Sequence, residues 1–207
     1  MVNDTRSTAL GVRPRRGAPR KGEPTARERI LAAASRLFYQ EGIRAIGIDT
    51  VIAESGVAKA SFYRTFDSKD ALIEAFVAER DRLFWMWWDT TVKEHGDDPC
   101  ALLDALLVGV ARQIKQADYR GCPFLNTITE FPDNTHPGRV VARANKDELR
   151  TRLTALCTRI GVTNPERVGA QLFLLINGAY AAGQMASDTD LRSTLVEAAH
   201  SLISSPM

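Results

Sequence analysis

The chain has 207 residues and a mass of 22.8 kDa, which is room for one large domain or for two smaller ones. Apolar residues make up 44% of it and charged residues 25%, so a wholly disordered chain is excluded. No apolar run approaches the ~18 residues of a membrane span, and no apolar stretch follows the arginine-rich start as in a secretory signal. Three cysteines in no metal-ligand spacing suit a reducing compartment, so we expect a cytoplasmic protein without metal, cofactor or membrane partner.

Residues 1–24 form a basic head on a mildly acidic body. They contain six basic and two acidic residues, a net charge of +4, whereas residues 81–207 contain 13 basic and 15 acidic residues, a net charge of −2. Prolines and glycines separate the basic residues, and such a composition cannot build a core, so the sequence predicts a disordered arm over 1–24. Contact with a polyanion would explain this charge, and a solvated tail without a partner would explain it equally well.

Ordered structure is expected from Thr25 onward, where a helix begins. Thr25 and Glu28 have the spacing of a capping box, whose hydroxyl and carboxylate satisfy backbone N–H groups at a helix start. Apolar residues follow at helical spacing, and Gly42 ends the helix. Two very short helices come next, at residues 48–55 and 59–66, joined by a tight glycine turn. Neither would be stable alone, so they are interpreted as a helix-turn-helix packed on the first helix.

The rest of the chain contains the start signals and the apolar periodicity of helices. Ser68 can cap the next helix, and Asp98-Pro99 and Asn164-Pro165 each place a cap residue before a proline at the first helical position. Apolar stripes at helical spacing predict further helices at residues 149–160, 172–179 and 191–202. No run alternates with period two, so the predicted fold class is all-α, with about nine helices and no sheet.

The second short helix of the pair has one face without acidic residues. If Phe62 and Phe66 point inward, the outer positions are occupied by Lys59, Ala60, Ser61, Tyr63 and Arg64. Lysine and arginine reach guanine edges or phosphates, alanine contacts a thymine methyl group, and hydroxyls donate to phosphate oxygens. The face therefore suits the major groove of DNA. A solvated face that happens to lack acids is the alternative.

Residue types also follow a fixed pattern over residues 25–75. The pattern includes the stretch Ile52–Phe66, then Ser68 and Lys69, with the Leu37-Phe38 pair and Gly42 where the first helix ends. It resembles the DNA-binding domain of TetR-family transcriptional regulators. Beyond this segment only an all-helical architecture carries over, with a helix-turn-helix domain at residues 25–70 and a ligand-binding and dimerisation domain at 71–207.

The resemblance implies roles for individual residues. Lys59, Ala60 and Ser61 match the start of the recognition helix, Tyr63 a tyrosine that binds phosphate, and Lys69 a lysine that contacts the DNA backbone. The predicted DNA-binding residues are Thr25, Thr50, Lys59, Ala60, Ser61, Tyr63, Arg64 and Lys69. Two positions depart from the family pattern: Gly47 replaces the usual threonine or serine cap, and Asp49 brings a charge that suits a helix start but is repelled by phosphate.

The basic arm fits a DNA-binding chain. Flexible basic arms can follow the minor groove, where narrow A·T tracts attract arginine. We therefore hypothesise that the arm adds affinity with little sequence discrimination. The residues expected to do so are Arg13, Arg15, Arg16, Arg20 and Lys21.

The C-terminal helices predict a homodimer. One recognition helix reads only a few base pairs, so specificity usually requires two domains on a palindrome. Residues 165–184 are unusually apolar and rich in small residues, and the helix at 189–203 is amphipathic, so the two helices of each copy can form a four-helix bundle. The resemblance implies the same interface. The predicted interface residues are Leu172, Leu175, Ile176, Ala179, Gly183, Leu191, Leu195 and Leu202. An intramolecular core would explain the same stripes.

Aromatic residues in the 70–160 region predict a box for a small apolar or aromatic ligand. Trp85 and Trp88 can share a helix face, and residues 121–132 place polar groups among aromatic ones. The predicted pocket residues are Phe84, Trp85, Trp88, Cys122, Phe124, Asn126, Glu130, Phe131 and Phe173. An aromatic core is the alternative, and Cys122 is read either as a reactive thiol or as a buried, inert one.

Motifs of catalysis are missing from the sequence. The histidines are isolated, and there is no phosphate-binding glycine loop, nucleophile elbow or His-Glu-x-x-His motif, so no enzyme is expected. The sequence predicts a DNA-binding transcriptional regulator, a repressor that a small ligand releases from a palindromic operator. Two alternatives stay open. One is a regulator controlled by thiol oxidation or by a protein partner, and the other is a helical interaction protein that keeps the helix-turn-helix domain only as a scaffold.

Overall fold

The computed structural model describes residues 23–185 and 190–204, and this part of the chain forms nine helices and no strand. The helices are α1 (Ala26–Glu41), α2 (Ile48–Ser55), α3 (Lys59–Thr65), α4 (Lys69–His95), α5 (Pro99–Ile114), α6 (Pro123–Glu130), α7 (Pro137–Ile160), α8 (Pro165–Ala182) and α9 (Leu191–Ser204). The predicted all-α class is confirmed. None of the described helices has the length and apolar character of a membrane span. The arm residues Arg13, Arg15, Arg16, Arg20 and Lys21 lie outside the described residues.

Local interactions begin and end the helices at the predicted residues. Thr25 Oγ1 accepts a hydrogen bond from the backbone N–H of Glu28 at 3.2 Å, and Glu28 Oε2 accepts one from the N–H of Thr25 at 2.7 Å, so the capping box is complete. Gly42, with φ of 96°, ends α1, and Gly56, with φ of 63°, ends α2. Both backbones occupy the positive-φ region that favours glycine. Side-chain caps begin three later helices, at Ser68, Asp98 and Asn164.

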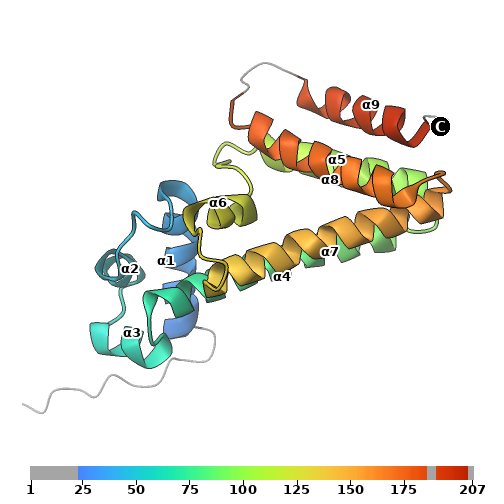
Figure 1. Ribbon diagram of the computed structural model, residues 1–207. Helices are drawn as coiled ribbons and strands as arrows, with labels where there is room; N and C mark the ends of the chain where they lie inside the picture. Colours follow the sequence, from blue (N-terminus) through green and yellow to red (C-terminus); the bar gives the residue numbers. More distant parts are fainter. Residues whose placement is uncertain (1–22, 186–189, 205–207) are drawn as a thin grey trace, which may run out of the picture.

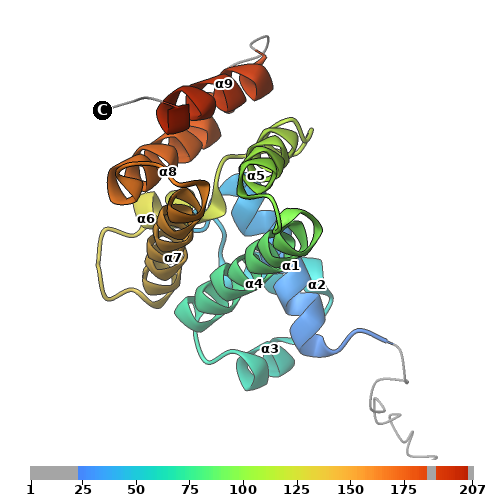
Figure 2. The same ribbon diagram turned by 90° about the vertical axis from the view of Figure 1, so that its right-hand side faces the viewer.

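Two long helices connect the two ends of the molecule. Helices α4 and α7 pack against each other along their length, with α1, α2 and α3 at one end and α5, α8 and α9 at the other (Figure 1). The view in Figure 2 shows α4 passing beside α1 on its way from the three-helix end. Since α4 has 27 residues, it spans about 40 Å at 1.5 Å per residue. Helix α4 therefore reaches from the three-helix end, where it contacts α1, to the other end, where it contacts α5.

The short helices are held in place by a shared apolar core. Phe62 on α3 is fully buried, and Phe66 directly after it is 5% exposed, as the sequence predicts. Both belong to one buried cluster with Val51 of α2 and Leu37 of α1. Because these rings point inward, the remaining side chains of α3 lie on its outer face.

The apolar stripe of α8 is largely internal, which corrects part of the predicted dimer interface. Leu172, Ile176 and Ala179 on α8 and Leu195 on α9 are buried within the single chain, because α8 packs on α7 and α9 packs on both α5 and α8. They form core and have no surface to offer a second copy. The other predicted interface residues are partly exposed: Leu175, Gly183, Leu191 and Leu202.

Candidate nucleic-acid interface and effector cavity

The outer face of α3 is polar and open to solvent. Lys59, Ala60, Tyr63 and Arg64 are exposed on it, and Ser61 is half-buried. The ring of Tyr63, 45% exposed, packs edge-on against that of Phe62 with centroids 5.3 Å apart, which fixes the orientation of the phenol. Arg64 Nη2 donates a hydrogen bond to Ser61 Oγ at 2.8 Å, so these two side chains lie together one turn apart.

An ion pair joins α2 to the start of α3. Nζ of Lys59 lies 2.9 Å from Oδ1 of Asp49, and both side chains are well exposed. The hydrogen bond to the Asp49 carboxylate raises the pKa of the Lys59 ammonium, which therefore stays protonated. The two charges stand ten residues apart in the sequence. Only the packing of α2 beside α3 shows that they meet.

The other predicted DNA-binding residues lie at helix starts in the same three-helix end. Thr50 is exposed on the first turn of α2. The hydroxyl of Thr25 is engaged in the capping box of α1, where it also donates to Glu28 Oε2 at 2.9 Å. Lys69 begins α4, and its Nζ donates to the carbonyl oxygen of Arg44 at 3.5 Å. Partial burial lowers the pKa of Lys69.

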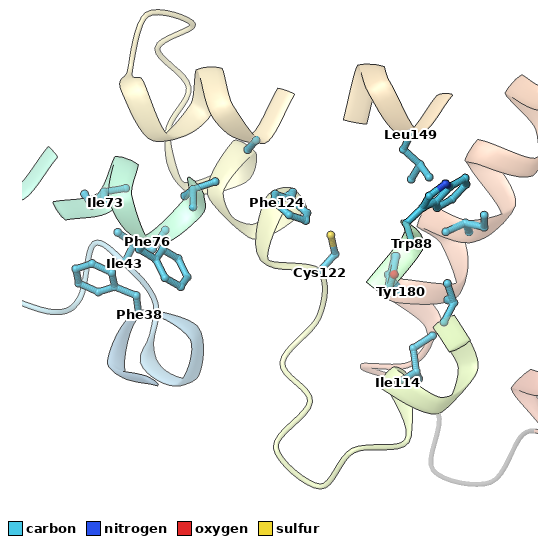
Figure 3. Close-up of a cluster of buried hydrophobic side chains, with 14 of the residues drawn as sticks. Phe38, Ile43, Ile73, Phe76, Trp88, Ile114, Cys122, Phe124, Leu149 and Tyr180 are labelled. Atoms are coloured by element: carbon cyan, nitrogen blue, oxygen red, sulfur yellow. The ribbon is translucent and has the colours of Figure 1, made fainter. Parts of the chain in front are cut away.

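A cavity of about 420 Å³ lies among α1, α4, α5, α6, α7 and α8. Its volume is in the range of sites that hold small ligands, about 300–1,000 Å³. Three predicted pocket residues line it, namely Phe84, Cys122 and Phe124. Figure 3 shows Cys122 and Phe124 between the buried residues around Phe76 and those around Tyr180. The tryptophan that lines the cavity is Trp87, which is not among the predicted pocket residues.

Six predicted pocket residues do not line the cavity: Trp85, Trp88, Asn126, Glu130, Phe131 and Phe173. Trp85 is turned toward α7, where the guanidinium of Arg152 lies 4.1 Å above its ring, and its Nε1 donates to Asp81 at 2.8 Å. Trp88 is buried core. The helix turns successive residues by about 100°, so the tryptophans at 85, 87 and 88 cannot share a face, and packing decided which of them faces the cavity.

The other four have structural partners of their own. The side-chain amide of Asn126 donates to the carbonyl oxygen of Arg120 at 2.8 Å, and the ring of Phe131 stacks on that of His136 with centroids 3.9 Å apart. Phe173 is partly buried against the core. Glu130 accepts hydrogen bonds from the connection between α1 and α2.

Glu130 fastens the end of α6 to the three-helix end. Its Oε1 accepts a hydrogen bond from the backbone N–H of Ile43 at 3.1 Å, and its Oε2 accepts one from the N–H of Arg44 at 2.8 Å. Helix α6 begins next to the cavity, at Cys122 and Phe124, and ends at Glu130. One eight-residue helix thus touches the cavity at its start and the α1–α2 connection at its end.

The three cysteines are unpaired thiols in different environments. Cys100 is exposed on α5, whereas Cys122 and Cys157 are buried. Burial raises the pKa of Cys157 to about 11, which disfavours its reactive thiolate. Within the described residues, no group of three or more histidine, cysteine, aspartate or glutamate side chains is arranged to hold a metal ion.

Comparison with known proteins adds to this geometry. Residues 30–76, which cover α2, α3 and parts of α1 and α4, match the family of bacterial regulatory proteins called tetR. A solved TetR-family transcriptional regulator from Streptomyces coelicolor is 30% identical, with a TM-score of 0.80 over 86% of this chain and 94% of that chain. The HTH-type transcriptional regulator YjdC of Escherichia coli is 22% identical over 83% of this chain and 91% of its own length.

Other relatives match over shorter stretches of the chain. An uncharacterised HTH-type transcriptional regulator from Mycobacterium tuberculosis is 42% identical over 57 residues, which are 28% of this chain and 28% of the relative. The matched stretch thus spans little more than a quarter of that protein. The family model likewise matches a part of the chain only, residues 30–76.

Proposed function

The chain belongs to the TetR family, and from that premise we propose that this DNA-binding transcriptional regulator is a repressor, released from a palindromic operator by a small ligand. Members of the family are regulators and not enzymes, in agreement with the sequence prediction. The observation that carries the proposal is the outer face of α3, where Lys59, Tyr63 and Arg64 are exposed while Phe62 anchors the helix from behind.

The α3 face has the chemistry of a major-groove reader. The guanidinium of Arg64 can pair with a guanine edge or a phosphate, and the methyl group of Ala60 can contact a thymine methyl group. The hydroxyl of Tyr63 can donate a hydrogen bond to a phosphate, and so can the ammonium of Lys69, the first residue of α4. Thr25 caps the start of α1 and Thr50 lies on the first turn of α2, and in this proposal both contact backbone phosphates. In this proposal residues 25–70 read the DNA, and residues 71–207 sense the ligand and dimerise.

An exposed apolar face on α8 supports a homodimer. Leu174 is 68% exposed and Met185, just after the helix, is 81% exposed. Gly178 and Ala181 are also exposed between them, and the spacings of four, three and four residues place all four on one face. Small residues between large apolar ones allow two helices to approach closely. We propose that this face pairs with its copy around a two-fold axis and brings in the partly exposed Leu175 and Gly183.

Helices α4 and α6 provide the coupling between ligand and DNA in this proposal. Phe84 of α4 and Phe124 of α6 both line the cavity, while α4 begins at Lys69 and α6 ends at the Glu130 cap of the α1–α2 connection. A ligand that favours a different placement of these two helices would reorient the α3 helices of the dimer. A ligand with equal affinity for both placements of the helices would not release the protein from its operator.

Footprinting tests the proposal. The purified chain is incubated with the DNA that flanks its own gene, and protection is mapped on both strands. We expect a protected site with two-fold symmetry and two major-groove contacts about 34 Å apart, one helical turn of B-form DNA. Protection without symmetry, or no protection beyond that of unrelated DNA, would contradict the palindromic operator.

A further inference from the structure

A lysine ammonium without a carboxylate partner projects toward the cavity. Lys146 on α7 lines the cavity and is 6% exposed. Its Nζ lies 5.6 Å from the ring centroid of Phe124 and 5.4 Å from that of Tyr180, and within the described residues it has neither a hydrogen bond nor an ion pair. Burying an ammonium without a partner is costly, and two aromatic faces compensate only in part. An anion bound in the cavity would give this ammonium a charged partner.

The other charges around the cavity also favour an anionic ligand. Arg80 and Arg112 also line it, against one carboxylate, that of Asp118. The guanidinium of Arg80 lies 5.0 Å from the centroid of the Tyr39 ring, and its Nε is buried without a hydrogen-bond partner. Asp118 is exposed, so solvent screens it more than it screens Lys146. The lining is cationic overall, and its most deeply buried charge is Lys146.

The apolar part of the lining defines the rest of the occupant. Phe84 packs edge-on against Phe124 with centroids 6.0 Å apart, and against Trp87 with centroids 5.5 Å apart. Rings placed in this way offer edges and faces to a flat aromatic body. A volume of about 420 Å³ accepts a ligand of two or three fused or linked rings.

We propose that the effector is a small aromatic anion, a carboxylate or sulfonate, whose charge pairs with the Lys146 ammonium. The proposal rests on the function proposed above for the cavity and adds the chemical class of its ligand. Pairing with the anion would draw Lys146 away from Phe124, which belongs to the helix that ends at Glu130. The anion would thereby change the contacts of α6, and the neutral form of the same molecule would not.

Two matched fluorescent probes test the charge requirement. The sulfonate 8-anilino-1-naphthalenesulfonate and the uncharged N-phenyl-1-naphthylamine share the same rings. We expect the full chain to bind the sulfonate about tenfold more tightly than the uncharged probe, and Lys146→Met to abolish this difference by weakening sulfonate binding alone. Lys146→Arg should retain the preference, and Lys93→Met, which removes an exposed lysine from the far end of α4, should change neither probe.

The outcomes separate this proposal from the proposed function. Equal affinities of the unmodified chain for both probes, or sulfonate binding that Lys146→Met leaves unchanged, would overturn the anion proposal. Thermal unfolding of each variant shows whether it is folded, and Lys146→Gln, which also removes the charge, replaces Lys146→Met if that variant is not folded. DNA binding of the unmodified chain is measured separately, without probe. Failure of the unmodified chain to bind its flanking DNA would reject the repressor function, while the result on the probes would stand.

Discussion

The ammonium of Lys59 lies 2.9 Å from the carboxylate of Asp49, across the turn that joins α2 to α3. Asp49 is thus an acid at the edge of a surface that otherwise presents cations, hydroxyls and a methyl group. DNA phosphates and Asp49 compete for the ammonium of Lys59. The ion pair with Asp49 therefore weakens the interaction between Lys59 and the DNA.

Asp49→Asn should therefore strengthen DNA binding. The substitution removes a charge that phosphate repels and frees Lys59 for a phosphate contact. We expect affinity at low salt to rise about five- to tenfold, and the plot of log affinity against log salt concentration to steepen by about 0.9. Fluorescence anisotropy over a salt series measures both. Glu197→Gln on α9 is the control for loss of a distant charge. Weaker binding by Asp49→Asn would mean that the acid positions Lys59 instead of competing for it.

The hydroxyl of Tyr63 and the guanidinium of Arg64 should matter for DNA binding and not for folding. Tyr63→Phe keeps the ring that packs on Phe62, and Arg64→Ala removes an exposed side chain. We expect each to weaken operator binding by about three- to thirtyfold, the cost of one or two polar contacts, with unchanged unfolding temperature. Arg150→Ala, on the exposed side of α7, is the matched control. Full operator affinity in both variants would contradict the proposed role of the α3 face in DNA binding.

Removing the Glu130 cap should loosen the link between the cavity and the three-helix end. Glu130→Ala leaves the N–H groups of Ile43 and Arg44 without their carboxylate acceptor. We expect the free energy of unfolding in urea to fall by about 1–3 kcal/mol. A probe that releases DNA from the unmodified chain should release less of it from this variant. Glu74→Ala removes an exposed acid of α4 for comparison, and an equal response in the two variants would rule out α6 as a coupling element.

Charge on the α8 face should separate the proposed dimer. Leu174→Glu places a carboxylate in the middle of that face, where it would meet its own copy across the two-fold axis. We expect light scattering after size exclusion to give the mass of one chain, 22.8 kDa, in place of two. Val140→Glu, on an exposed apolar residue of α7, should keep the mass of the unmodified chain. A dimer that persists in Leu174→Glu would place the interface elsewhere.

Thiol reactivity should follow burial. Cys100 should react with a disulfide reagent at pH 8 well before Cys122 and Cys157, which are buried. With a pKa of about 11, Cys157 is a thiolate in about one molecule in a thousand at that pH. Each further pH unit should raise its reaction rate about tenfold until the pKa is reached. Operator release by oxidant that disappears in the triple serine variant of Cys100, Cys122 and Cys157 would instead support thiol control.

Features that depend on a few neighbouring residues could be predicted from the sequence. The Thr25–Glu28 capping box, the turn at Gly56 and the Asn164 cap before a proline each act within four residues, so their geometry follows from spacing alone. The inward orientation of Phe62 and the outward face of α3 follow from helical periodicity in the same way.

Which of two apolar faces of a helix is core, and which lies at the surface, depends on how the helices pack. Leu172 and Leu174 are equally apolar neighbours on α8, yet one is fully buried and the other 68% exposed, because α7 and α9 cover one side of the helix. The set of residues that line the cavity could likewise not be predicted from the sequence. Trp87, Lys146 and Tyr180 come from three helices far apart along the chain, and a side chain's partners across such distances depend on how the helices pack.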